Sequence, residues 1–361
     1  MKLLVCPTCA GLLFLESLRC EACGTEVAYH VPTAEMVAVT GRDIPVGERI
    51  WHPCSNRQWD CNWLVADETG TGRCFSCQLT RTRPAADDTI ALEKLASTAQ
   101  AKRRLLVQLK SLGLPVDPHF ERDGGLGFDL ISSFSENRQV MIGHANGIVT
   151  IDLAESLDEH RERLRIALGE PYRTMLGHFR HEVGHYYQWV LVEQTDRIDE
   201  CRGLFGDERA SYSDAIARHY ATGSPDGWEA SFISEYATMH PWEDFAECFA
   251  HYLHINETLN TAATAGLELA LERQRVITLP QVVAPKERYG AGEFDALLED
   301  WRWVSLFFNR ANRAMGKADL YPFRITPAVA EKLRFIHRVL TDPPPSRVEE
   351  SDGFRRQVRP E

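Results

Sequence analysis

The chain has 361 residues and carries 40 Lys plus Arg against 52 Asp plus Glu, which gives a formal net charge of −12. This acidic balance argues against broad binding to nucleic-acid phosphates and is ordinary for an enzyme. No apolar run reaches the roughly 18 residues of a membrane span, and the apolar start is too short for a secretory signal before the first cysteine pair. From its length we expect the chain to form two or three structural units. We expect the protein in the cytoplasm, with neither a membrane nor a nucleic-acid partner.

The first 77 residues hold eight of the ten cysteines, arranged in two modules. The first module is Cys6-x2-Cys9 with Cys20-x2-Cys23, and the second is Cys54-x6-Cys61 with Cys74-x2-Cys77. Pairs at this spacing form tight knuckles, and two knuckles close a tetrahedral S₄ zinc site. The spacing predicts two zinc ribbons with structural metals, because modules this small cannot build a sufficient core alone. Two disulfides per module are the alternative, and His52 is an alternative ligand in the second module.

Prolines and composition divide the chain into four parts. We expect zinc ribbon 1 at residues 1–35, zinc ribbon 2 at 36–84, a larger domain at 85–340 and a disordered, proline-rich tail at 341–361. Apolar periodicity predicts helices over Asp88–Leu112, Glu155–Leu168 and Phe294–Met315. The basic cluster AKRR in the first of these helices is expected to be a solvated face, because basic residues do not continue on either side.

A hairpin is predicted over Gln139–Leu153, which reads QVMIGHANGIVTIDL. Two β-rich runs joined by Asn-Gly, here Asn146-Gly147, are the strongest short signal for a hairpin. We expect it in a small sheet, where it either has a structural role or aligns an extended peptide by strand addition.

Residues 176–191, LGHFRHEVGHYYQWVL, hold the strongest chemical signal of the chain. His181, Glu182 and His185 form H-E-x-x-H. Two histidines four apart on a helix point the same way and can hold one Zn²⁺, and the glutamate can reach a water on that metal. His178 falls on the same face, while the opposite face is apolar. The pattern predicts a metal-site helix docked on a core, and a solvated face with incidental histidines is the alternative.

A catalytic zinc needs a third protein ligand and one open position. The best candidate segment is Trp242–Ile255, WEDFAECFAHYLHI, where a predicted helix places Glu243, Glu247 and His254 on one face. Carboxylates four apart suit one metal ligand and one acceptor that orients a ligating histidine. The spacing leaves open which glutamate has which role, and a plain amphipathic helix would give the same pattern.

HEVGH followed by E-x-F-A-E-x-F-A resembles the gluzincins, which are zinc peptidases with a glutamate as third ligand. More closely, the chain resembles the zinc-binding metallopeptidases that carry an N-terminal zinc ribbon. The resemblance lies in the paired cysteines and in AKRRLLVQLKSLGLPV, GHANGIVTIDLAE, GEPYRTMLGHFRHEVGHYYQ, LFGDERASY and HPWEDFAECFAHYLHI. It implies that His181, His185 and Glu243 bind zinc, that Glu182 is the general base, and that Glu247 orients a ligand. One segment departs from the family pattern: ESLDEHRERLR stands where a more acidic stretch is expected.

Some gluzincins place an oxyanion-stabilising Tyr or His near the third ligand, and Tyr236, or alternatively His240, matches that placement. The prediction is an α+β enzyme: two small N-terminal zinc ribbons followed by a mainly helical, zincin-like metallopeptidase domain with a small β-sheet. It would hydrolyse peptide bonds with one catalytic and two structural Zn²⁺.

The alternative function is a zinc-ribbon adaptor for protein or nucleic acid, on a non-catalytic zincin-like scaffold. Residues 1–83 hold 8 Lys plus Arg and 9 Asp plus Glu, so no basic footprint supports nucleic acid there. A protein partner that docks on the zinc ribbons fits either function.

Overall fold

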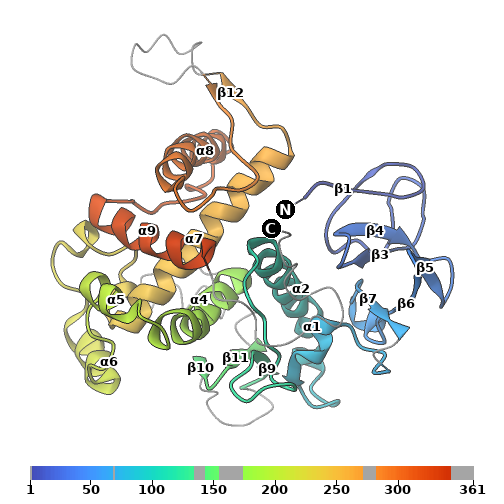
Figure 1. The fold of residues 1–361 in the computed structure, drawn as a ribbon, viewed down its shortest axis with the longest axis horizontal. Helices are drawn as coiled ribbons and strands as arrows, with labels where there is room; N and C mark the ends of the chain where they lie inside the picture. Colours follow the sequence, from blue (N-terminus) through green and yellow to red (C-terminus); the bar gives the residue numbers. More distant parts are fainter. Residues whose placement is uncertain (1, 68–69, 134–142, 154–173, 271–281, 343–361) are drawn as a thin grey trace. The chain divides into compact units, whose positions relative to one another are not determined.

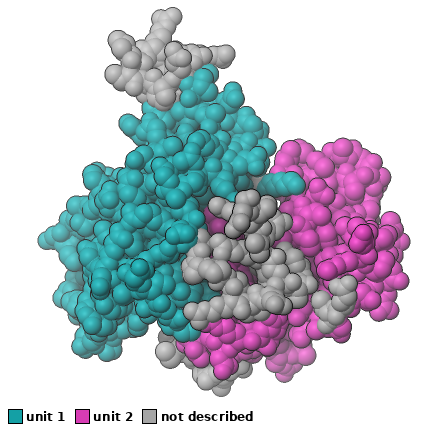
Figure 2. Space-filling model, viewed as in Figure 1, with its two compact units in different colours: residues 1–2, 163–342 teal, residues 3–162, 343–361 magenta. Residues whose placement is uncertain are grey.

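The computed structural model describes residues 2–67, 70–133, 143–153, 174–270 and 282–342 (Figure 1). The contacts between residues divide the chain into two compact units (Figure 2). One, the N-terminal unit, comprises residues 3–162 with 343–361. The other, the helical unit, comprises residues 163–342 with 1–2. The predicted helix over Glu155–Leu168 and nearly all of the predicted tail at 341–361 lie outside the described residues.

Among its described residues, the N-terminal unit has short strands and two α-helices. Its strands are β1 (Leu4–Val5), β2 (Leu12–Leu13), β3 (Val27–His30), β4 (Glu35–Ala38), β5 (Ile44–Val46), β6 (Arg49–Pro53), β7 (Leu64–Ala66), β8 (Thr80–Thr82), β9 (Gly127–Ile131), β10 (Gly143–Ala145) and β11 (Ile148–Asp152). Its helices are α1 (Phe75–Gln78) and α2 (Thr89–Leu112), with a 3₁₀ turn at Arg57–Trp59.

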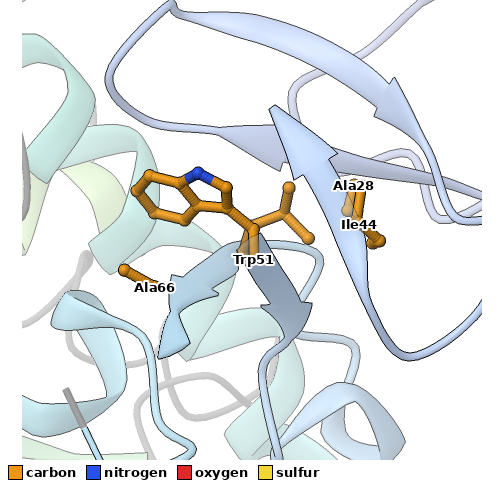
Figure 3. Close-up of a cluster of buried hydrophobic side chains, with 5 residues drawn as sticks. Ala28, Ile44, Trp51 and Ala66 are labelled. Carbon is orange, nitrogen blue, oxygen red and sulfur yellow. The ribbon is translucent and has the colours of Figure 1, made fainter. Parts of the chain in front are cut away.

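The two cysteine modules share one apolar core. Ala28, Ile44, Trp51, Leu64 and Ala66 come from β3, β5, β6 and β7 and are all buried (Figure 3). The backbone joins the same modules, because Tyr29 N–H donates to the Asn62 carbonyl at 2.7 Å. Each module alone is too small to build a sufficient core, so this shared core supplies burial that neither would reach separately.

A four-stranded sheet with the order β10-β11-β9-β8 links the second cysteine module to the predicted hairpin. β10 and β11 are antiparallel, and their turn places Asn146 and Gly147 at φ of 49° and 83°. Positive φ at both positions is the type I′ geometry that Asn-Gly favours, which confirms the hairpin over residues 143–152. Residues 139–142 of the predicted range lie outside the described residues. β9 lies between β11 and β8 and is parallel to both.

Helix α2 confirms the helix predicted over Asp88–Leu112. The Asp88 carboxylate accepts from Ala91 N–H at its start, and Gly113 ends it with a φ of 71°. The prediction that AKRR forms a solvated face was wrong for Lys102 and Arg103, which are 1% and 2% exposed.

Both buried cations of α2 contact the knuckles of the second cysteine module. Lys102 Nζ donates to the Ser76 carbonyl at 2.6 Å, and Arg103 Nη2 donates to the Asp60 carbonyl at 2.8 Å. Ser76 lies between Cys74 and Cys77, and Asp60 directly precedes Cys61. A buried cation is stable only where it meets such acceptors or a negative charge. The carbonyl groups beside the cysteines therefore explain why Lys102 and Arg103 are buried.

The helical unit is dominated by long helices. It contains α4 (Met175–Gln188) with a π-helical turn at Trp189–Glu193, α5 (Ile198–Phe205), α6 (Tyr212–Thr222), α7 (Pro241–Thr264), α8 (Phe294–Ala314) and α9 (Pro327–Thr341). Short 3₁₀ turns lie at Trp228–Ala230 and Tyr236–Thr238, and β12 (Leu269–Ala270) pairs with β13 (Val282–Val283). Helix α8 confirms the helix predicted over Phe294–Met315. Among the helices that the structure describes, none has the length and apolar character needed to cross a membrane.

Helices α4 and α7 pack closely along their length (Figure 1). A Cβ on Gly184 would lie 3.0 Å from the Ala246 Cα and 3.3 Å from the Phe249 Cβ, so any larger residue would require the two helices to move apart slightly. Tyr187 of α4 stacks on Phe249 of α7, with ring centroids 5.5 Å apart. This pairing brings the two predicted ligand helices together.

A buried ion pair ties α7 to α9. Lys332 Nζ lies 2.5 Å from an Asp244 carboxylate oxygen, and both side chains are almost fully buried. Lys332 also donates to the Ser231 carbonyl at 2.8 Å. Removing either partner of such a pair would leave a buried charge uncompensated.

The fold class is therefore α+β, with two Cys₄ clusters at the N-terminus, small sheets and a mostly helical C-terminal part.

Candidate metal centres

The eight N-terminal cysteines gather into the two predicted clusters, Cys6-Cys9-Cys20-Cys23 and Cys54-Cys61-Cys74-Cys77. All ten cysteines of the chain have free thiols, so the disulfide alternative is wrong. His52 belongs to neither cluster: its Nε2 contacts the Asp67 carboxylate at 2.8 Å.

Sulfur spacing in both clusters suits a tetrahedral metal. Adjacent Sγ atoms are 3.6 Å apart in the first cluster and 3.6 to 3.7 Å apart in the second. A tetrahedron with Zn–S bonds of about 2.3 Å has edges of about 3.8 Å. Backbone N–H groups also point at sulfur, as Thr8 does to Cys6 at 3.4 Å and Cys74 to Cys54 at 3.3 Å. The eight residues thus fit two S₄ zinc sites.

In the helical unit, α4 and α7 bring together His181, His185 and Glu243. Their ligand atoms all lie within 4.8 Å of one another. Glu243 Oε2 is 2.9 Å from His181 Nε2 and 3.6 Å from His185 Nε2. Ligands of a tetrahedral zinc with bonds of about 2.1 Å are about 3.4 Å apart. Two imidazoles and a carboxylate are a common catalytic zinc set, so these three residues fit the metal.

The start of each helix fixes these ligands in place. Thr174 caps α4, with its hydroxyl accepting from Gly177 N–H at 3.0 Å. His240 caps α7: its Nδ1 accepts from Trp242 N–H at 3.1 Å, and Pro241 occupies the first turn. Because His240 Nε2 also contacts the Ala210 carbonyl at 3.0 Å, both of its ring nitrogens are engaged in structure.

Two more carboxylate contacts orient His181 and Glu243. His181 Nδ1 donates to Glu247 Oε1 at 2.7 Å, and the Ser234 hydroxyl donates to the other Glu247 oxygen at 2.6 Å. The Tyr212 hydroxyl donates to Glu243 Oε1 at 2.7 Å, which leaves Oε2 facing the histidines. Glu247 therefore lies behind His181, as an orienting acceptor does, while Glu243 lies on the ligand side.

Electrostatics at this site favour a cation. Burial alone would lower the pKa of His181, but the carboxylates on both sides of the ring raise it well above its ordinary value. Burial would raise the pKa of Glu243, yet the charges and hydrogen bonds of His185 and His181 hold it well below its ordinary value. An imidazole between two carboxylates needs a proton or a metal ion at each ring nitrogen.

Glu182 lies beside this set, 5% exposed. Its Oε1 accepts from His178 Nε2 at 3.1 Å, whereas its Oε2 has no hydrogen-bond partner among the described residues. Burial raises the pKa of this carboxyl, but the hydrogen bond and charge of His178 and the charges of His181 and His185 lower it overall. A buried carboxylate oxygen is rarely left without a hydrogen-bond partner. The water of the predicted zinc site would be such a partner for Oε2.

Tyr236, the first candidate for an oxyanion donor, is half-buried next to His181. Its ring centroid is 5.8 Å from that of His181. His240, the alternative candidate, is engaged as the α7 cap.

Sequence reasoning missed the roles of Tyr212 and Ser234, and it assigned none to His178. Tyr212 and Ser234 reach the site from segments without a metal-binding pattern, so no local signal marked them. His178 carried a signal, because it lies one helical turn before Glu182 on the same face.

Two sequence comparisons agree with this geometry. Residues 91–339 match the family described as "Putative zinc-binding metallo-peptidase", and residues 3–88 match a zinc-ribbon domain. Uncharacterized proteins of Mycobacterium bovis and Mycobacterium tuberculosis are each 42% identical over 348 residues, which cover 94% of this chain and 95% of the relative. No solved structure matches the chain with significance. The family match and the two relatives together show that the chain belongs to the zinc-binding metallopeptidase family, with a zinc-ribbon domain at its N-terminus.

Proposed function

We propose that the protein is a zinc-dependent peptidase of the gluzincin type. His181, His185 and Glu243 would hold one catalytic zinc, and the two cysteine clusters would hold one structural zinc each. The observation that carries the proposal is the convergence of two imidazoles from α4 and one carboxylate from α7 within 4.8 Å. The buried Glu182 beside them supplies the base that such a site requires.

When bound, zinc would polarise the scissile carbonyl and make water a nucleophile at neutral pH. Glu182 is ionised at neutral pH because its pKa is lowered, so it can take a proton from the attacking water. It then returns that proton to the leaving amine. The Tyr236 side chain, whose ring centroid is 5.8 Å from that of His181, would donate its hydroxyl to the developing oxyanion, and the loss of such a donor typically costs about 2.7–4 kcal/mol.

The substrate would be a peptide or protein, and the compartment the cytoplasm. Free thiols at all ten cysteines support a reducing environment.

A Glu182→Gln variant tests the assignment of the base. Glutamine keeps the size of the side chain but cannot take up the proton, so the variant should retain three zinc per chain and lose cleavage of labelled casein by about 10²-fold or more. The matched control is Glu299→Gln, which changes a half-exposed carboxylate of α8 that accepts from Trp303 and pairs with Arg302. Wild-type cleavage by the Glu182→Gln protein, with zinc bound, would remove Glu182 from the mechanism.

A further inference from the structure

We propose that His178 is a positioning residue for Glu182: it holds one carboxylate oxygen so that the other is presented to the reacting water. This inference rests on the proposed function, because it concerns the base of that reaction. Its basis is the hydrogen bond between the two side chains.

The contact is short and lies inside the protein. His178 Nε2 is 3.1 Å from Glu182 Oε1, and the two side chains are 8% and 7% exposed. A carboxylate can only accept, so the Nε2–H of His178 donates. Surface histidines four residues from a glutamate are common on helices, but they seldom bury both partners. A buried pair of this kind holds its geometry, since no water competes for the bond.

The two oxygens of Glu182 therefore differ. Oε1 is fixed by His178, while Oε2 is fully buried without a partner among the described residues. The neighbouring charges that act on this carboxylate are those of His178, His181 and His185, and it in turn acts on Tyr212. Glu182 thus lies among the ligands and their support, with one oxygen restrained and one available. Holding a base in one rotamer is how a site pre-organises proton transfer.

The test compares His178→Leu, which removes the donor, with His178→Gln, which keeps an N–H donor. The matched control is His219→Leu, a partly exposed histidine on α6 outside the site. Three readouts are used: zinc content, kcat and KM on labelled casein, and calorimetric affinity for acetohydroxamate. This probe chelates zinc through two oxygens and passes a proton to a neighbouring carboxylate. Its binding reports on the base without requiring turnover.

Loss of positioning should leave zinc content and KM unchanged in His178→Leu, lower kcat by about 10-fold to 10²-fold, and weaken acetohydroxamate binding. His178→Gln should recover most of both losses. If His178 acts through Glu182, the His178→Leu change should have no further effect in a Glu182→Gln background.

Wild-type kcat and probe affinity in His178→Leu would overturn the proposal. So would equal defects in the Leu and Gln variants, additive effects with Glu182→Gln, or loss of catalytic zinc from both variants. If the wild-type protein cleaves no casein, the proposed function fails, and the acetohydroxamate comparison between the same variants still decides the role of His178.

Discussion

The two glutamates of α7 have different surroundings, which fit the different roles proposed for them at the metal. Glu243 Oε2 faces both histidines, whereas Glu247 lies on the Nδ1 side of His181 and is held by Ser234. A ligand contributes a bond to the metal, while an orienting partner only restrains a ligand. The two should therefore differ sharply in their effect on zinc affinity.

Replacing each glutamate by alanine tests this difference. Glu243→Ala should reduce the zinc that survives gel filtration from three to two per chain. Glu247→Ala should keep three zinc at saturation and weaken the catalytic site by about 10-fold to 100-fold, as measured with a competing chelator. The reverse order of effects would make Glu247 the ligand.

Tyr212 should strengthen zinc binding by restraining the Glu243 carboxylate. Its hydroxyl donates to Glu243 Oε1 at 2.7 Å, a charge-assisted bond inside the site. Tyr212→Phe should weaken zinc binding at the catalytic site by about 10-fold or more, because it leaves Glu243 less restrained. Tyr220→Phe, on the same helix with Tyr220 69% exposed, is the control and should bind zinc like the wild type. Equal affinities in both variants would separate Tyr212 from the metal site.

At this scale the sequence predicted the residues that a motif fixes and missed those that only the tertiary structure selects. H-E-x-x-H and the spacing of the α7 carboxylates are local, so they could be read from the chain alone. Tyr212 and Ser234 belong to α6 and to the segment before α7, and their partners lie 31 and 13 residues away in sequence. Nothing in a single sequence marks such partners.

Among the elements, the contact of α4 with α7 brings together all three proposed ligands. Gly184 is part of that contact, because its added Cβ would meet the Ala246 backbone at 3.0 Å. Gly184→Ala should separate the helices and lower stability by about 1–3 kcal/mol. The catalytic zinc should also bind more weakly.

Gly203→Ala is the matched control for that substitution. Gly203 lies in α5 with nothing within 4 Å of an added Cβ. Alanine should raise stability there by up to about 1 kcal/mol, since glycine is the poorer helix former. Thermal unfolding of both variants measures the contrast, and a stabilised Gly184→Ala protein would contradict the close packing of α4 on α7.

The buried cations of helix α2 should slow the release of zinc from the second cysteine cluster. A tetrathiolate zinc carries a net negative charge, and Lys102 and Arg103 place buried positive charges at its two knuckles. Lys102→Met keeps most of the side-chain volume and removes the charge, so zinc should transfer from this cluster to a chelator several-fold faster. Lys94→Met, a partly exposed position on the same helix, should leave the rate unchanged.

A wild-type release rate in the Lys102→Met protein would show that α2 and the cluster are energetically separate. The AKRR prediction failed for a physical reason: a basic run on a helix is usually solvated, and only the position of the cysteine knuckles makes a buried site for it. The hairpin and the α2 ends were predictable because Asn146-Gly147, Asp88 and Gly113 are local determinants.

At the scale of the whole molecule, the order of the motifs along the chain predicted the α+β class. It also predicted that the cysteine modules precede the helices with the proposed ligands. No change in composition marks the boundary between the two units at residues 162 and 163. The N-terminal unit extends beyond the cysteine modules because of long-range strand pairing. β8, which follows the second module, pairs with β9, and the register pair Thr80–Phe128 is 48 residues apart in sequence. The predicted boundaries at 35, 84 and 340 therefore stay predictions.

The central claim is that two imidazoles and one carboxylate of the helical unit share a zinc ion. Anomalous diffraction at the zinc edge, from crystals of the protein grown with zinc, tests it most directly. We predict three peaks per chain, one in each cysteine cluster and one about 2.0–2.2 Å from His181, His185 and Glu243 together. A map with peaks only at the cysteine clusters, or with a third peak that these residues do not jointly hold, would contradict the account.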